Sequence, residues 1–333
     1  MGNGETIYAG KRALVTGGAG FIGSHLARRL HELGAEVSVV DAMIPNCGGN
    51  LYNLEPIRDA VALHIVDMRD CERMRPLVRA QDFILNLAGK VSHIDSMQDP
   101  HQDQGINCES QLALLETCRC ENPSAPIVYA STRQQYGRPL YTPVDEDHPL
   151  LPTDFNGINK LAGEWYHRLY ARLHRMQITS LRLTNTYGPG LLISHDRQGF
   201  LSVFIRRVLT GEPIRVFGDG SQLRDLNYVD DVVDALLAAA ARPDAAGAGE
   251  VYNLGSPEAI SLKEVAELMV RIVGCGRVEL VPFPNELRRI DIGSYQGDFR
   301  RIHKALGWQP RISVEEGLRR TLAFYREHGG HYL

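Results

Sequence analysis

The segment RALVTGGAGFIG, residues 12–23, decides the fold of this 333-residue chain. Residues 12–16 have the pattern of a buried strand, and apolar residues recur at helical spacing from 21 to 33. Between them, Gly17, Gly20 and Gly23 have the spacing that lets a backbone turn tightly beneath a pyrophosphate. The N-terminus of the following helix offers unpaired N–H groups and a partial positive charge to the same anion. The segment therefore predicts a strand–turn–helix unit that binds a dinucleotide.

Short apolar runs alternate with helical patterns through the rest of the first half. Strands that alternate with helices are typical of a parallel sheet covered on both faces. We therefore expect an α/β protein with a Rossmann-type, doubly wound parallel sheet. Its strands are expected at residues 12–16, 36–41, 62–66, 83–88, 127–131 and 180–185.

The rhythm changes after Asn185, where a turn and a polar, irregular segment follow. Beyond it we expect helices at 200–209, 230–241 and 314–327, and strands at 214–217 and 251–254. These pieces predict a smaller C-terminal substrate-binding lobe. We expect residues 1–186 to form the dinucleotide-binding domain, joined again by about 225–256, and 187–224 with 257–333 to form the lobe.

Composition excludes several classes of protein. The net charge is −4 with no long run of one sign, so nucleic acid is not an expected partner. No stretch approaches the roughly 20 apolar residues that span a bilayer, and residues 1–10 lack a signal peptide's apolar run. The six cysteines have no zinc-site spacing. We expect reduced thiols, no metal, no membrane contact and a cytoplasmic protein.

Two carboxylates bear on the choice of dinucleotide. Asp41 ends the second strand, where a carboxylate can accept hydrogen bonds from both adenosine ribose hydroxyls and would repel a 2′-phosphate. The sequence therefore favours NAD over NADP. Asp67, after the third strand, can accept from the adenine amino group, or it can cap a helix.

Further motifs carry a resemblance to a known family. The chain resembles the sugar-nucleotide epimerase, dehydratase and decarboxylase branch of the extended short-chain dehydrogenase/reductase family over nearly its whole length. The similar segments are residues 16–23, 87–89, 131–132 with 136–137, 182–189, 217–220 with 224–225, 288–292 and 306–310.

The resemblance implies a site for NAD and one for a nucleoside diphosphate sugar. It implies cofactor contacts from Gly17, Gly20, Phe21, Ile22, Gly23, Asp41, Asp67, Met68, Leu87, Ala88 and Lys160. It implies substrate contacts from Lys90, Ser92, Arg133, Asn185, Arg197, Phe217, Arg224 and Arg288. Forked arginine donors and the Asn185 amide are suited to a diphosphate bridge.

The chain departs from the family at the residue expected to move a proton. The family uses a Tyr-x-x-x-Lys pair, whose Tyr removes the sugar hydroxyl proton while a Ser or Thr bonds the same oxygen. Here Thr132 and Lys160 match, but Asn156 replaces the Tyr, and an amide cannot act as a base. Three interpretations stay open: a different base, proton removal by Lys160 itself, or binding without turnover. The alternative bases are Tyr136, Tyr141, Lys90 and His93.

Neighbouring positions bear on the reaction. The family's dehydratases carry an acid pair just after the Thr, and its decarboxylases carry a Glu at the second position; here these are Arg133 and Gln134. Epimerisation through a transient keto sugar needs no acid there, so it is the leading prediction, with dehydration, decarboxylation, simple oxidation and pure binding as alternatives. Arg133 can face an acidic sugar, or it can pair with Asp145 or Glu146.

The resemblance also implies a homodimer. In the family, two helices that correspond to residues 106–120 and 157–173 pair with their copies as a four-helix interface. Both segments have apolar faces that the monomer itself could instead bury.

Overall fold

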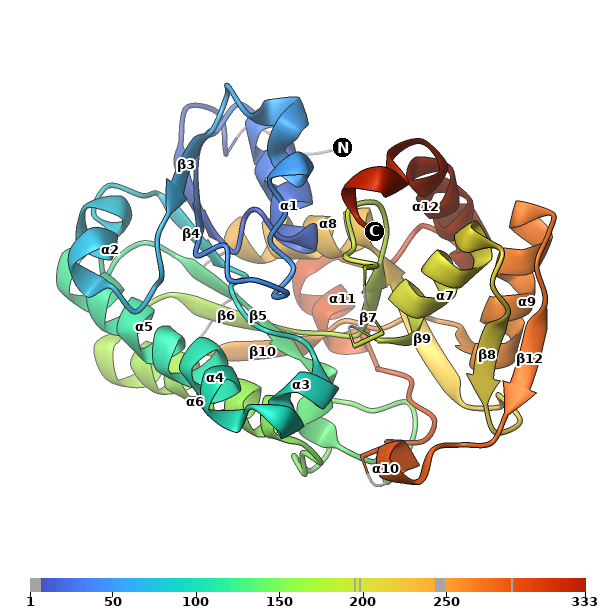
Figure 1. Cartoon of the computed structure of the whole chain (residues 1–333). Helices are drawn as coiled ribbons and strands as arrows, with labels where there is room; N and C mark the ends of the chain where they lie inside the picture. The colour runs from blue at the N-terminus through green and yellow to red at the C-terminus, as the bar shows by residue number, and fades with distance from the viewer. Residues whose placement is uncertain (1–6, 195, 198, 243–248, 289) are drawn as a thin grey trace.

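A seven-stranded, wholly parallel sheet forms the centre of the molecule (Figure 1). The computed structural model describes residues 7–194, 196–197, 199–242, 249–288 and 290–333. The strand order is β10-β6-β5-β4-β1-β2-β3, so the chain winds outward in both directions from β1 and β4, and the predicted Rossmann-type fold is confirmed. The strands are β1 Arg12–Thr16, β2 Glu36–Asp41, β3 Ala62–Ile65, β4 Phe83–Asn86, β5 Ile127–Thr132, β6 Ile178–Leu183 and β10 Glu250–Asn253.

Alternation of side chains along each strand builds a core on both faces of the sheet. Ala13 and Val15 pack on one face with helices α1 (Phe21–Glu32) and α8 (Val229–Ala240). Leu14 points to the other face, into the core formed by α2 (Cys71–Val78), α5 (Ser110–Glu121) and α6 (Phe155–His174). Figure 1 shows these last three helices together on the lower left.

A smaller lobe lies at the right of Figure 1. It holds a three-stranded sheet of order β11-β9-β7 and a parallel pair, β12-β8. Its core contains buried apolar residues of α7, α9 and α12. The strands are β7 Asn185–Tyr187, β8 Ile214–Phe217, β9 Leu223–Tyr228, β11 Ala259–Ser261 and β12 Val278–Val281, and the helices are α7 Phe200–Thr210, α9 Leu262–Val273 and α12 Val314–His328.

Short helical pieces connect these layers. They are η1 Leu51–Ile57, α3 His93–Gln98, α4 Pro100–Gln104, η2 Gly105–Glu109, η3 Arg133–Tyr136, α10 Asn285–Arg288, α11 Arg300–Leu306 and η5 Gly329–His331. The helix expected to start at Ile106 begins instead with the π-helical turn η2 and becomes regular at Ser110. In the described part of the chain, no helix is long and apolar enough to cross a membrane.

Several strand ends differ from the expectation by one or two residues, such as β4, which ends at Asn86 and not at residue 88. Two differences bear on the architecture. The strand expected to run to residue 185 ends at Leu183, because Thr184 turns away and its hydroxyl binds the Asp225 carboxylate, so Asn185 starts β7 in the other sheet. The segment with Ile302, Leu306 and Trp308 packs into the core beside α1 and α8, although it was expected in the smaller lobe. We therefore propose the expected division into lobes with residues 299–308 moved to the larger one.

A buried ion pair attaches α6 to the sheet. The Arg182 guanidinium on β6 donates to both Glu164 oxygens on α6, at 3.0 Å from Nε and 2.6 Å from Nη2. The side chains are 2% and 0% exposed. Ser131 Oγ on β5 donates to the same carboxylate at 2.7 Å. Burial opposes ionisation of Glu164, but the Arg182 charge and the hydrogen bonds prevail, so its pKa is lowered.

We expect Glu164→Gln to lower the free energy of unfolding by about 3–5 kcal/mol, because it leaves the Arg182 charge buried without its partner. Chemical denaturation at neutral pH measures this difference. Glu315→Gln, which breaks an exposed pair with Arg319, is the matched control and should cost less than about 1 kcal/mol. Equal losses in the two variants would contradict the anchoring role of Glu164.

Candidate active site

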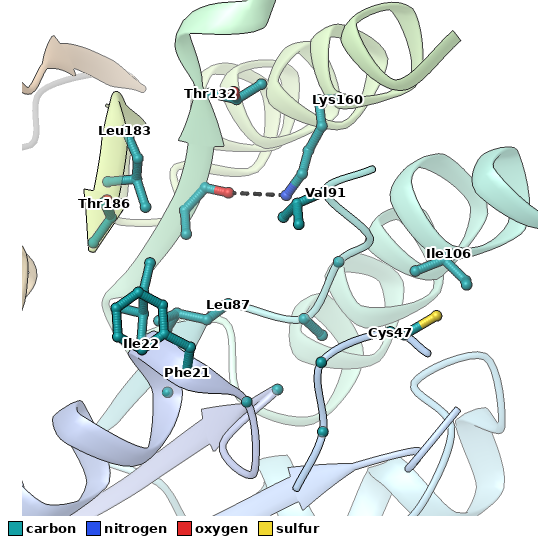
Figure 2. Close-up of a pocket in the computed structure, with 18 of the residues that line it drawn as sticks. Phe21, Ile22, Cys47, Leu87, Val91, Ile106, Thr132, Lys160, Leu183 and Thr186 are labelled. Carbon is teal, nitrogen blue, oxygen red and sulfur yellow. Dashed lines mark hydrogen bonds between the residues drawn. The ribbon is translucent and has the colours of Figure 1, made fainter. Parts of the chain in front are cut away.

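One cavity of about 330 Å³ opens along the carboxyl ends of the central strands. Its wall is formed by the segments that follow β1, β2, β3, β4, β5 and β6, with the start of α6 and the loop before α7. The loops of a doubly wound sheet meet at this edge, where the winding direction reverses between β1 and β4. Figure 2 shows Phe21, Ile22 and Leu87 on one side of the cavity and Lys160 reaching in from α6.

The glycine loop is shaped for close approach of an anion. Gly17 has φ +65°, and a Cβ on Gly23 would lie 2.2 Å from the Gly17 carbonyl oxygen, so a side chain at either position would deform the turn. The N-cap of α1 is Gly20, which makes no side-chain cap, and the first turn carries no acidic residue. The first N–H groups and the partial positive charge of α1 are therefore available to a diphosphate.

Two carboxylates line the far end of the cavity. Asp41 accepts from the backbone N–H of Ala19 at 3.1 Å and of Met43 at 2.9 Å, which fixes it beside the glycine loop. Burial raises its pKa. Asp67 forms a forked ion pair with Arg69, at 3.0 and 2.7 Å, and this hydrogen bonding lowers its pKa. Each oxygen of Asp41 keeps a lone pair for a ribose hydroxyl.

Lys160 and Thr132 stand at the other end of the cavity. The Lys160 Nζ donates to the Ala130 carbonyl at 3.1 Å, shown dashed in Figure 2, and lies 5.3 Å from the centre of the Tyr129 ring. Burial lowers the pKa of Lys160 to about 8, and the Asp103 charge limits the fall. Thr132 ends β5, where its Oγ1 accepts from the Gln134 N–H at 3.2 Å.

Asn156 uses its amide on the protein itself. It is 1% exposed, and its Nδ2 donates to the Lys90 carbonyl at 2.7 Å and to Asp103 Oδ2 at 2.9 Å. Asn159, one position before Lys160, donates to the other Asp103 oxygen at 2.8 Å. Asn156 and Asn159 therefore hold the carboxylate that favours the charged form of Lys160. The position of the missing Tyr thus has an electrostatic and packing role.

Arg133 and Asn185 present unused donors beside Thr132. The Arg133 guanidinium is buried 4.8 Å from the centre of the Tyr295 ring, and its Nη2 donates to Asn185 Oδ1 at 3.2 Å. Arg133 Nη1 and Asn185 Nδ2 have no hydrogen-bond partner among the described residues, and both residues line the cavity. Burial lowers the pKa of Arg133. Neither Asp145 nor Glu146 forms an ion pair with it, so that expected alternative is not realised in the described structure.

Comparison with known proteins agrees with this arrangement. Residues 13–255 match the model of the NAD dependent epimerase/dehydratase family. The protein belongs to this family. It is 32% identical over 316 residues to the UDP-glucose 4-epimerase of Mycolicibacterium smegmatis, covering 95% of this chain and 98% of that protein. It is 30% identical over 326 residues to UDP-glucuronic acid decarboxylase 1 of Xenopus tropicalis, covering 96% and 73%.

A solved structure in this epimerase/dehydratase family extends the comparison to the cofactor. The UDP-glucose 4-epimerase of Thermus thermophilus, in complex with NAD, matches with a TM-score of 0.83 and 31% identity. The match covers 95% of this chain and 99% of that one. The expected resemblance is confirmed, and with it NAD as the cofactor. The glycine loop, the uncapped start of α1 and Asp41 fit this group.

The cavity brings together all the residues predicted for the cofactor and for catalysis. Of the eight residues predicted for the substrate, only Arg133 and Asn185 lie in the cavity wall. The cofactor and catalytic residues in the wall are Gly17, Gly20, Phe21, Ile22, Gly23, Asp41, Asp67, Met68, Leu87, Ala88, Thr132, Asn156 and Lys160.

Three of the other predicted substrate residues belong to a polar cluster around α3. Lys90 Nζ donates to Gln102 at 2.5 Å and lies 3.9 Å from Asp95. Arg197 lies 3.2 Å from Asp95, and its carbonyl accepts from Ser92 Oγ at 2.8 Å. In the structure these groups attach the loop before α7 to α3, and they are not in the cavity wall.

The remaining three contact or belong to the segment of residues 283–293. Arg224 donates to the carbonyls of Leu223 and Gly293 and lies 3.7 Å from Asp291, so its donors serve that loop. Burial lowers the pKa of Arg224 to about 10, with a contribution from the Arg133 charge. Phe217 packs on Phe283, and the exposed Arg288 lies 5.8 Å from the centre of the same ring. The neighbouring Arg289 is outside the described residues.

A polar pair at the N-terminus of α6, formed by Asp154 and His93, is harder to predict from the sequence. Asp154 caps α6 by accepting the Gly157 N–H at 2.7 Å, and its second oxygen bonds to His93 Nδ1. His93 and Gln134 line the cavity. An Asp before a helical pattern signals an N-cap, but no local pattern joins it to a histidine 61 positions away.

The lowered pKa of Lys160 predicts a dependence of stability on pH. Between about pH 8 and the ordinary lysine value of 10.5, the unfolded chain keeps a proton that the native protein has lost. Stability from this group therefore rises with pH, by up to about 1.4 kcal/mol per unit. Denaturation of the protein and of Lys160→Met at about pH 8 and about pH 10 measures the difference. Parallel profiles would contradict the assignment.

Proposed function

We propose that the protein epimerises the sugar of a nucleoside diphosphate sugar through transient oxidation to a keto sugar. One observation carries this proposal. A single cavity joins the dinucleotide loop, Thr132 and Lys160, and the unused donors of Arg133 and Asn185. Buried donors without partners are costly, and a bound anion would satisfy them.

The side chains divide the work by position. Bound NAD supplies a hydride acceptor that later returns the hydride. The start of α1 holds the cofactor diphosphate, and Asp41 holds the adenosine ribose. Lys160 holds the nicotinamide ribose and adds positive charge, and Thr132 Oγ1 bonds the sugar oxygen that is oxidised. Arg133 and Asn185 donate to the diphosphate or to a carboxylate on the sugar.

Epimerisation is favoured because the groups for the related reactions are replaced. Arg133 and Gln134 stand where an acid pair would eliminate water, and Gln134 has no charge to assist decarboxylation. Return of the hydride to the opposite face of a turned keto sugar needs neither group. The unpaired Arg133 Nη1 favours one refinement, a sugar that carries a carboxylate.

A non-catalytic protein that binds NAD and a sugar nucleotide is the second candidate. It is supported by Asn156, whose amide nitrogen donates to Asp103 and to the Lys90 carbonyl and cannot take a proton.

We expect the purified protein, loaded with NAD, to show transient absorbance of reduced nicotinamide when mixed with a sugar nucleotide. UDP-glucose, UDP-N-acetylglucosamine and UDP-glucuronate form the first trial set, followed by analysis of the recovered sugars for epimers. If Arg133 faces a carboxylate, Arg133→Met should lower the binding affinity for UDP-glucuronate at least about tenfold more than the affinity for UDP-glucose. Binding of NAD and nucleotide without absorbance for any sugar would favour the second candidate.

We also propose that two copies pair through α5 and α6, which lie side by side at the lower left of Figure 1. A stripe of exposed apolar side chains follows helical spacing along α6, with Leu112 beside it on α5. The α6 members are Ile158, Trp165, Leu169 and Leu173, between 40% and 64% exposed. Apolar side chains that are exposed in a continuous stripe, and not singly, mark a surface that binds another protein.

We also propose a cytoplasmic location, which the free cysteines support.

We expect the protein to sediment as a dimer and Leu169→Glu to sediment as a monomer, because a charge would be buried in the paired stripe. Leu140→Glu is the matched control, since Leu140 is 68% exposed on a loop and lines a surface hollow with residues 291–294. A monomer at micromolar concentration before any substitution would contradict the pairing.

A further inference from the structure

We propose that His93, oriented by Asp154, is the group that takes the sugar hydroxyl proton in place of the missing Tyr. This inference rests on the proposed function and names its base. His93 is the first residue of α3 and lines the same cavity as Thr132 and Lys160. Its side chain is 35% exposed, so a ligand in the cavity can reach it.

The partners of the ring fix which nitrogen can accept a proton. Nδ1 bonds to Asp154 Oδ2, and the Asp154 side chain is 3% exposed. Burial opposes ionisation of Asp154, but the His93 bond and the Gly157 N–H prevail and lower its pKa. Because an ionised carboxylate only accepts hydrogen bonds, Nδ1 carries a proton toward Asp154, and the lone pair of the ring lies on Nε2, on the side away from Asp154.

Gln134 completes the arrangement at Nε2. The Gln134 Nε2 amide nitrogen lies 2.6 Å from His93 Nε2 and donates to it, while Gln134 Oε1 has no partner among the described groups. When Nε2 gains a proton it becomes a donor, and the Gln134 amide can turn Oε1 toward it. Both protonation states of His93 therefore have a hydrogen-bond partner within one side-chain rotation.

The step balances without a further reactant. The Gln134 amide first turns away from His93 Nε2, and the sugar hydroxyl takes its place as the donor to that atom. The sugar O–H bond then breaks and its proton moves to Nε2, while the hydrogen on the same carbon leaves as hydride to the oxidised nicotinamide, leaving a carbonyl. Return of the hydride and of the His93 proton restores the hydroxyl. Asp154 stabilises the imidazolium between the two events, as carboxylates do for histidine bases in other enzymes.

The other predicted bases are committed elsewhere. The buried Tyr136 OH donates to Asn253 at 2.6 Å and accepts from Arg182 at 2.6 Å. Tyr141 donates to Asp145 in a separate surface hollow. Lys90 is outside the cavity wall and bonds to Gln102. Lys160 Nζ donates to the Ala130 carbonyl at 3.1 Å and lies 5.3 Å from the centre of the Tyr129 ring, so its ammonium group is held by the sheet.

The test compares His93→Asn and Asp154→Asn with the unmodified protein. Asp154→Asn keeps an oxygen to accept the Gly157 N–H, so the α6 cap is retained while the charge is removed. We expect the transient absorbance to form about 10²–10⁴-fold more slowly in His93→Asn. In Asp154→Asn we expect at least about a tenfold loss of this rate, because the amide no longer fixes the ring tautomer or stabilises the imidazolium. Added imidazole should restore part of the rate in a smaller His93→Gly variant.

Two readouts separate this role from a structural one. Calorimetric affinities for NAD and for UDP should stay within about threefold in both variants, since neither residue is required for binding energy. Nitrogen-15 spectra of the unmodified protein without substrate should show His93 with its proton on Nδ1, and Asp154→Asn should shift that signal. His101→Asn, on the exposed side of α4, is the control and should leave every readout unchanged.

The outcomes are distinguishable. Unchanged hydride transfer in His93→Asn, or a neutral ring protonated on Nε2, would overturn the assignment of the base and leave the proposed function standing. Absence of hydride transfer in the unmodified protein, with every sugar nucleotide tried, would overturn the proposed function and this assignment together.

Discussion

The buried ion pair between Arg182 and Glu164 fixes the element on which the whole site depends. Helix α6 carries Asn156 and Lys160 at its start, and Glu164 lies one turn beyond Lys160 on the same helix. The forked contact to β6, with the Ser131 hydroxyl from β5, sets both the rotation and the height of α6 against the sheet. A buried pair of this kind gains little net stability over apolar packing, but it penalises other registers because either charge alone would be buried unpaired.

Above this anchor, a second buried network controls the charge at the reactive end of the cavity. Asp103 is held by the amides of Asn156 and Asn159, and its charge partly opposes the desolvation of Lys160. A phenol at position 156 has a single O–H donor, so it could not bond to both Asp103 and the Lys90 carbonyl as the Asn156 amide does. The amide therefore suits a site in which the lysine charge is maintained from behind and proton transfer is given to another element. That division separates two tasks that the family's Tyr-x-x-x-Lys pair combines.

A cationic side chain is available to a ligand only if its N–H groups are not already hydrogen-bonded within the protein. Arg224 is buried, and its Nη1 donates to two backbone carbonyls. In contrast, Arg133 Nη1 and the neighbouring Asn185 Nδ2 have no hydrogen-bond partner among the described residues. Lys90 and Arg197 share Asp95 and position α3, which in turn places His93 over the cavity. Lys90 and Arg197, which the sequence suggested for substrate binding, thus hold α3 and the loop before α7 in place.

The sequence alone determined the central sheet, the glycine loop and NAD as the cofactor, because these depend on local periodicity, on glycine spacing and on residues at strand ends. Every residue predicted for NAD lies in the cavity wall for that reason. It also revealed the exchange of Tyr for Asn156. Only the tertiary structure decided that β6 ends at Leu183 and that Arg224 donates to the Gly293 carbonyl. It also decided that His93 bonds to Asp154, which lies 61 positions further along the chain. The His93–Asp154 contact arises from packing between α3 and α6. All three outcomes depend on contacts between distant parts of the chain, which no local spacing records.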